Sequence, residues 1–208
     1  MSFLISCLGI AVSYLIGSIP TAYIFGRVIK GVDIRQFGSG NVGATNAFRV
    51  VGRLPGLFVL IIDIFKGFVC VTYVASFFMY LTPVLRPDFY RVITGLFVIL
   101  GHNWPIFLKF KGGKGVATSA GVVIGLIPKI FWLGFVVWCI IFSVTGFVSV
   151  ASVIASVAIP ILVLFFKEST EIVIFMSILC TLIVYKHKSN IKRLIEGKEK
   201  KISLFKKR

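Results

Sequence analysis

The sequence predicts an all-α integral membrane protein with about seven membrane-spanning helices. Of its 208 residues, 58% are hydrophobic and only 14% are charged, and the mean hydropathy is +1.00. A soluble domain contains roughly a quarter charged residues. The apolar residues also fall into long runs, several of which reach the ~20 residues that a transmembrane helix requires.

Taken in order, the expected spans lie at about 3–25, 54–81, 89–103, 116–128, 130–144, 150–166 and 171–186. The third can extend to residue 108, and the third and fourth are short. The first is expected to be retained, because it lacks the basic start of a cleaved signal peptide. Prolines at 55, 105, 128 and 160 are expected to mark helix ends or kinks.

The net charge of +16 is concentrated in three segments, 26–53, 104–115 and 186–208. The positive-inside rule therefore predicts an outside N-terminus and a cytoplasmic C-terminus. The same orientation places the turn at 145–149 in the cytoplasm. We expect a single membrane domain over 1–208, with these four segments contributing to one site. Nucleic acid is not an expected partner, because the aromatic residues lie in the spans rather than beside the basic clusters.

The first cytoplasmic segment contains "FGSGNVGATNAFRVVG", residues 37–52. Glycines allow a ligand to approach the backbone closely, and the polar side chains supply hydrogen-bonding groups. An arginine can hold two phosphate oxygens at once. A solvated turn with a helix cap is the alternative, but the density of polar residues favours a ligand site. The candidates are Ser39, Asn41, Gly43, Thr45, Asn46 and Arg49.

The second candidate segment is "FKGGKGVATS", residues 110–119. It is not a nucleotide-binding P-loop, because Gly115 stands where that motif requires Ser or Thr. Backbone N–H groups, two lysines and the start of a helix nevertheless favour an anionic ligand. A positive-inside cluster would explain the lysines but not the glycines. The candidates are Lys111, Gly112, Gly113, Lys114 and Gly115.

Asp63 and Lys66 are three residues apart within the second span. Unpaired charges are costly in lipid, so we expect an ion pair inside the bundle, with a proton or ion pathway as the alternative. His102 is more simply interpreted as a structural residue. His187 and Asn190 share a helix face just beyond the last span, where His187 is either structural or a proton carrier.

Several kinds of chemistry are not indicated. The four cysteines lie far apart in apolar runs, so no metal is expected. There is no G-x-S-x-G elbow and no His-x4-Asp pattern, so a covalent acyl-enzyme is not favoured. A transporter for a phosphorylated molecule remains an alternative, although transporters place polar groups near the midplane. A scaffold whose basic tail binds membrane lipid is a weaker alternative.

Six stretches resemble the bacterial acyl-phosphate:glycerol-3-phosphate acyltransferases: "GSIPTAYIFGR", "GSGNVGATNAFRVVG", "DIFKG", "GHNWPIFLKFKGGKGVATSAG", "VTGFVSVASV" and "KHKSNIKRLIEGKEKKI". The resemblance implies a multi-pass enzyme of the bacterial cytoplasmic membrane that acts in phospholipid biosynthesis. It would transfer an acyl group from acyl phosphate to the 1-position of sn-glycerol 3-phosphate, without coenzyme A, metal or other cofactor. Lysophosphatidic acid and phosphate would be the products.

The resemblance also implies roles for particular residues. Catalytic roles fall on Ser39, Arg49, Lys111, His187 and Asn190, and Ser149 joins the two loops in binding substrate. Glu196 is expected to be structural. Gly146 and Phe147 stand where many members have Arg-Tyr, which leaves Ser149 as the anion contact expected from this turn. The base is either His187 or the phosphate of the acyl donor.

Overall fold

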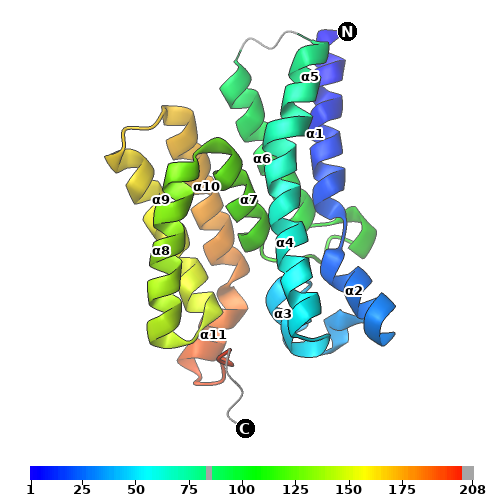
Figure 1. The fold of residues 1–208 in the computed structure, drawn as a ribbon, viewed down its shortest axis with the longest axis vertical. Coiled ribbons are helices and arrows are strands. Elements are labelled where there is room, and N and C mark those ends of the chain that lie inside the picture. Colours follow the sequence, from blue (N-terminus) through cyan, green and yellow to red (C-terminus); the bar gives the residue numbers. More distant parts are fainter. Residues whose placement is uncertain (83–85, 203–208) are drawn as a thin grey trace. The chain divides into compact units, whose positions relative to one another are not determined.

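The computed structural model describes residues 1–82 and 86–202, which form helices and connecting loops without a strand. The chain divides into two compact units, Met1–Ile127 and Pro128–Arg208 (Figure 1). Each unit is described by itself. The expectation of a single domain over the whole chain stays a prediction.

The first unit begins with two helices separated by a proline and ends with a short helix after a glycine-rich loop. The run from α4 to α5 is continuous, because the five residues between them form a π-helical stretch, η2. In order, the elements are α1 (Ser2–Ser18), α2 (Thr21–Lys30), η1 (Ile34–Gln36), α3 (Ala44–Val50), α4 (Arg53–Val69), η2 (Cys70–Val74), α5 (Ala75–Leu81), α6 (Pro87–Asn103), η3 (Ile106–Leu108) and α7 (Val116–Leu126).

Glycines let two pairs of helices in this unit approach closely. Helix α4 packs against α7, where a Cβ added to Gly121 would lie 1.8 Å from the carbonyl oxygen of Ile64. In the reciprocal contact, a Cβ on Gly67 would lie 2.1 Å from the carbonyl oxygen of Thr118. Helices α1 and α6 pack in the same way through Gly17 and Gly101. Small residues of this kind are typical of helix contacts in membranes.

The second unit contains α8 (Pro128–Thr145), α9 (Val148–Phe165), α10 (Thr170–Lys186) and α11 (Lys188–Ile195). Helix α9 packs against both α8 and α10. Pro128 begins α8, whereas Pro160 lies within α9. The chain bends by 51° between α10 and α11, so that α11 leaves the axis of the long helix.

Among the described residues, five helical runs are long and apolar enough to cross a membrane, and a sixth is added if α10 and α11 are one bent span. The fourth expected span is only the 11-residue α7. At 1.5 Å per residue it covers about 16 Å, roughly half of the ~30 Å hydrocarbon core. The total of seven crossings and the orientation of the termini therefore stay predictions.

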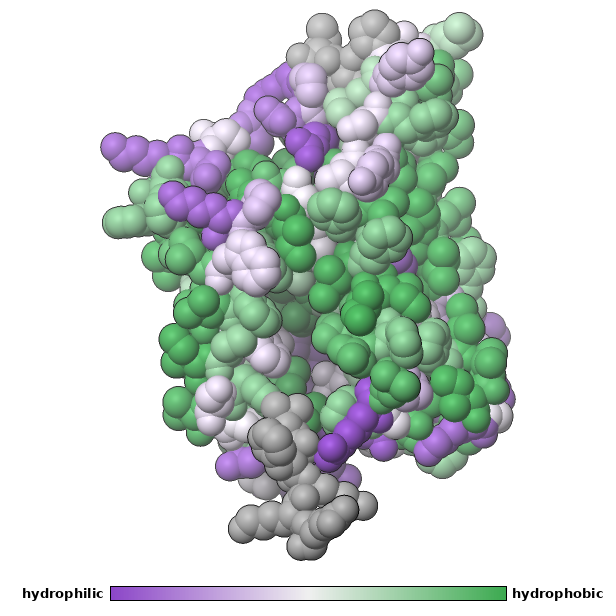
Figure 2. Space-filling model, in the orientation of Figure 1, coloured by the Kyte–Doolittle hydropathy of each residue, from purple (hydrophilic) through white to green (hydrophobic). Residues whose placement is uncertain are grey.

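The long helices of both units expose large apolar side chains. Phe65 of α4 is 60% exposed, and Trp132 of α8 and Ile161 of α9 are each 62% exposed. Hydrophobic residues cover much of the face drawn in Figure 2. So much exposed apolar surface would be unfavourable in water, and it fits helices that face lipid.

Candidate functional site

In the first unit, Ser39 is exposed on the loop between α2 and α3, residues 31–43. The side chain of Asn46 supports this loop through hydrogen bonds to its backbone. The Asn46 side chain is only 1% exposed. Its Oδ1 accepts from the backbone N–H of Ser39 at 2.9 Å, and its Nδ2 donates to the carbonyls of Ile34 and Phe37, each at 3.1 Å. Asn46, a candidate for substrate binding, thus has its amide committed to the loop backbone.

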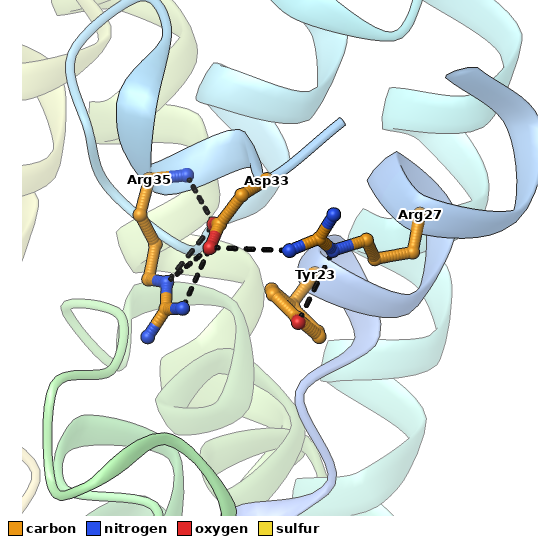
Figure 3. A network of polar contacts seen from close by, with 4 residues as sticks. All are labelled: Tyr23, Arg27, Asp33 and Arg35. Atoms are coloured by element: carbon orange, nitrogen blue, oxygen red, sulfur yellow. Dashed lines mark hydrogen bonds and ion pairs between the residues drawn. The ribbon is translucent and has the colours of Figure 1, made fainter. Parts of the chain in front are cut away.

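A second set of contacts fixes the start of this loop (Figure 3). Asp33 accepts from both Nε and Nη2 of Arg35, the shorter distance being 2.6 Å, and lies 3.7 Å from Arg27. The ring of Tyr23 lies beneath both guanidinium groups, at 5.4 Å and 5.2 Å from its centroid. The hydrogen bonds from Arg35 lower the pKa of Asp33 to about 2, so this carboxylate is ionised at neutral pH. None of these residues was predicted to belong to the site.

Residues 109–115 form a second loop, here called the glycine–lysine loop, which lies on the end of α6. The N–H of Gly113 donates to the carbonyl of His102 at 3.0 Å. A Cβ on Gly112 would lie 2.2 Å from that same carbonyl oxygen, and Gly115, with φ +80°, contacts the Asn103 amide. The loop exposes Lys111 and leads directly into the N-terminus of α7. Close packing on α6 is therefore one reason for the glycines.

The two loops share a hydrophobic core in this unit. Val42, from the end of the first loop, and Leu108, just before the glycine–lysine loop, belong to one buried cluster. Ala47 of α3 belongs to it as well and is 0% exposed. Helix α3 also carries Thr45 and Arg49, both half-buried. The first unit thus packs the segments that bear Ser39 and Arg49 against the segment that leads to Lys111.

Asp63 and Lys66 form the ion pair that their spacing predicts, with Lys66 Nζ 2.7 Å from Asp63 Oδ1. Their side chains are 2% and 6% exposed. Asp63 also accepts from the hydroxyl of Thr21 at 3.0 Å, and Lys66 donates to the carbonyl of Ile19 at 2.9 Å. The pair therefore ties α4 to the break between α1 and α2. These contacts satisfy the two charges where lipid would not.

In the second unit, two of the predicted residues, Ser149 and Asn190, meet around an unpredicted one, Glu199. The hydroxyl of Ser149 donates to Glu199 Oε1 at 3.0 Å, and Asn190 Nδ2 donates to the same oxygen at 2.5 Å. Arg193 Nε donates to Oε2 at 2.7 Å. Burial raises the pKa of Glu199, but the hydrogen bonds from Arg193, Asn190 and Ser149 together outweigh it and lower the pKa overall. His187 is 3% exposed and lies one turn before Asn190.

The expectation that Glu196 is the structural glutamate is not supported by its contacts. Glu196 is 36% exposed and pairs with two exposed lysines, Lys192 at 3.9 Å and Lys198 at 3.2 Å. Glu199 is 5% exposed and makes the buried hydrogen bonds instead. The reason is the turn after α11. Gly197 has φ +67°, and the N–H of Glu199 then bonds to the carbonyl of Arg193, which directs the later glutamate inward.

Among residues 1–82 and 86–202, no group of three or more His, Cys, Asp or Glu side chains is arranged to hold a metal ion. What the first unit does provide is an exposed serine on a braced loop, an arginine on α3 and a lysine-bearing loop at a helix N-terminus. Such groups attract an anion and orient it.

The family model for glycerol-3-phosphate acyltransferase matches residues 7–197, and so runs through both units. The chain belongs to the glycerol-3-phosphate acyltransferase family. It is 43% identical to the glycerol-3-phosphate acyltransferase of Endomicrobium trichonymphae, over 99% of this chain and 100% of that one. Identity to glycerol-3-phosphate acyltransferase 2 of Moorella thermoacetica is 42%, over 94% and 96%.

Two solved structures of this family have a similar fold. Both are crystal structures of PlsY, an integral membrane glycerol 3-phosphate acyltransferase, one in its glycerol 3-phosphate form and one in its lysophosphatidic acid form. The first has a TM-score of 0.86 at 36% identity, and covers 95% of this chain and 96% of its own. The second has a TM-score of 0.83 at the same identity, with 95% of each chain covered. This acyltransferase is therefore an integral membrane enzyme of phospholipid synthesis.

Proposed function

We propose that this glycerol-3-phosphate acyltransferase uses acyl phosphate as its donor and acylates the 1-hydroxyl of sn-glycerol 3-phosphate. The products are lysophosphatidic acid and inorganic phosphate. The arrangement in the first unit carries the proposal: the glycine–lysine loop offers Lys111 and Lys114 beside a helix N-terminus, on the same packed core as Ser39 and Arg49. Both substrates of this reaction carry a phosphate, and two cationic segments match two anions.

In the proposed step, the 1-hydroxyl oxygen attacks the acyl carbonyl carbon, and the bond between that carbon and the phosphate oxygen breaks. The electron pair leaves with the phosphate, and the hydroxyl proton passes either to His187 or to the phosphate itself. Arg49 and the two lysines stabilise the charge that develops on the carbonyl and the leaving group. Holding together two anions that otherwise repel supplies much of the rate.

His187 has a geometry that suits a base. Its Nδ1 lies 2.8 Å from the carbonyl oxygen of Ile183. Since a carbonyl can only accept, Nδ1 carries the proton, and in the neutral ring Nε2 is the basic nitrogen. Ser149 differs, because its one hydroxyl proton is donated to Glu199. Ser149 would therefore meet a phosphate oxygen only after giving up that bond.

The alternation of basic and less basic segments supports an orientation with the two loops and the C-terminal tail in the cytoplasm. We place the enzyme in the cytoplasmic membrane of a bacterium, with α7 counted as a short crossing. Glycerol 3-phosphate then arrives from the cytoplasm, and the acyl donor and the product are held by the lipid.

The test uses the purified protein in lipid vesicles with glycerol 3-phosphate and either palmitoyl phosphate or palmitoyl-CoA. Release of phosphate and formation of lysophosphatidic acid are followed together. We expect product from palmitoyl phosphate alone, with loss of activity in Lys114→Ala and retention in Lys30→Ala, which removes an exposed lysine from the end of α2. Product from palmitoyl-CoA alone would overturn the proposed donor.

His187→Ala tests whether His187 is the base, and only a near-normal kcat decides the question, because a folded but inactive variant fits either base. If His187 takes the proton, this variant folds but loses most of its kcat, and general-base catalysis typically contributes 10²–10⁴-fold. A near-normal kcat would exclude His187 as the base and leave the phosphate of the donor.

A further inference from the structure

The imidazole of His102 lies between the buried ion pair and the glycine–lysine loop. Its Nδ1 is 3.8 Å from Asp63 Oδ1, and its side chain is 8% exposed. Its opposite edge faces the loop, because a Cβ built on Gly113 would lie 2.1 Å from Nε2 and 2.9 Å from each neighbouring ring carbon. The ring thus fills the space between a fixed carboxylate and the loop backbone.

The carboxylate on the first side of the ring is firmly held. Asp63 forms an ion pair with Lys66 and accepts a hydrogen bond from the hydroxyl of Thr21, and Lys66 in turn donates to the carbonyl of Ile19. These partners come from α4, from α2 and from the break that precedes it. Because several helices fix its position, Asp63 gives His102 a rigid reference point.

On the other side, Gly112 and Gly113 are required for space rather than for an unusual backbone conformation. Neither has a positive φ. A Cβ on Gly112 would meet the backbone carbonyl of His102 and the ring of Pro105, whereas a Cβ on Gly113 would meet only the His102 imidazole among its nearest atoms. The two glycines stand between Lys111 and Lys114, so their distance from α6 decides where both cations stand.

We propose that His102 is a positioning residue for the glycine–lysine loop. It transmits the fixed position of the Asp63–Lys66 pair to Gly113 and thereby sets Lys111 and Lys114 at the spacing that glycerol 3-phosphate needs. The inference rests on the proposed function, with this loop taken as the glycerol 3-phosphate site, as the resemblance of residues 111–115 to the acyltransferase family implies. It gives the buried ion pair a part in substrate binding beyond its contribution to stability.

His102→Asn tests the inference with little risk to folding. The shorter amide keeps a donor near the position of Nδ1 toward Asp63, but removes the ring edge that contacts Gly113. We expect a similar midpoint of thermal unfolding, a KM for glycerol 3-phosphate raised by about tenfold or more, and a smaller change in kcat. Displacing a binding group by about 1 Å can cost 10²-fold in rate. A purely structural role would lower the unfolding midpoint and leave KM unchanged.

The decisive measurement is a double-mutant cycle with Gly113→Ala. In the wild-type background the new Cβ strikes the imidazole, so we expect a large increase in KM for glycerol 3-phosphate. In the His102→Asn background the same substitution has room, and we expect a further change within about twofold, a strong coupling between the two positions. Gly112→Ala is the matched control. Its Cβ strikes the backbone carbonyl of His102, so His102→Asn should not relieve it.

Equal costs of Gly113→Ala in both backgrounds would overturn the inference, as would a His102→Asn variant with an unchanged KM. Lys114→Ala distinguishes this failure from that of the proposed function. If Lys114→Ala raises KM and His102→Asn does not, the loop binds substrate but His102 does not position it. If Lys114→Ala leaves KM unchanged, the loop is not the glycerol 3-phosphate site and the inference fails, whereas the proposed donor is judged separately by comparing palmitoyl phosphate with palmitoyl-CoA.

Discussion

Replacing Asn46 by alanine should release the loop that carries Ser39. The Asn46 amide is buried and makes three hydrogen bonds to the loop backbone, to the N–H of Ser39 and to the carbonyls of Ile34 and Phe37. Gly38, whose φ is +63°, packs on the same amide, with Oδ1 2.2 Å from where its Cβ would be. Alanine removes all three bonds and leaves a void under the turn.

The size of the effect follows from these contacts. A net hydrogen bond contributes about 1 kcal/mol, and a buried polar group left without a partner costs ~1–3 kcal/mol. Three lost bonds, partly compensated by water at the exposed side of the loop, give a loss of about 2–4 kcal/mol. The kcat should also fall, and by more than the loss of folded protein alone would cause, because Ser39 and its N–H are no longer held in one place.

The assay compares thermal unfolding in detergent with the initial rate of acyl transfer to glycerol 3-phosphate. For Asn46→Ala we expect an unfolding midpoint several degrees lower and a kcat reduced by about tenfold or more. Asn41→Ala is the matched control for stability, because Asn41 lies in the same loop and is less buried. A midpoint and rate equal to those of the wild type would refute this reasoning. So would an equal loss of stability in the control.

Three further predictions concern other contacts. Gly121→Ala should destabilise the protein by about 1–3 kcal/mol through its clash with Ile64, whereas Gly134→Ala, whose Cβ would meet only the Ile159 side chain at 3.2 Å, should cost less in the same thermal assay. Glu199→Gln should destabilise the protein at pH 7. Since folding lowers the pKa of Glu199, the difference in stability between variant and wild type should shrink as the pH falls below the ordinary pKa of 4.5. A stability difference that does not depend on pH would contradict this prediction. Tyr23→Phe should keep the ring contacts with both guanidinium groups, lose only the hydrogen bond from Arg27 Nε to the Tyr23 hydroxyl, and keep most of the stability. Tyr23→Ala should lose the ring contacts as well, and equal unfolding midpoints for the two variants would contradict this.

The sequence predicted the long helices well, because extended apolar runs determine how far they reach. The second expected span, 54–81, corresponds to the continuous run Arg53–Leu81. The pairing of Asp63 with Lys66 was also predictable, since the two residues are one turn apart on a helix that has to bury them. Hydropathy gave no sign of the π-helical stretch within Arg53–Leu81 or of the break at Pro20 in the first expected span, because neither feature interrupts the apolar residues around it.

The parts that could not be predicted depend on where individual side chains point. The sequence shows Asn46 in a polar loop, but only the structure shows its amide buried beneath Ser39. Glu196 and Glu199 are equally plausible in a basic tail, and a single turn at Gly197 decides between them. The contact of Gly113 with His102 depends on how the chain folds back over the end of α6, which no local pattern records.

The buried pair of Asp63 and Lys66 also constrains how this enzyme can diverge. Removing one member of a buried ion pair leaves a charge without its partner and costs ~3–5 kcal/mol, whereas replacing both with apolar residues is often nearly neutral. Lineages can therefore abandon the pair only by changing two codons together or by passing through a weakened intermediate. Since Asp63 also lies beside His102, an apolar replacement would leave that imidazole without its carboxylate. The contact with His102 therefore limits replacement of the pair in addition to the attraction between Asp63 and Lys66.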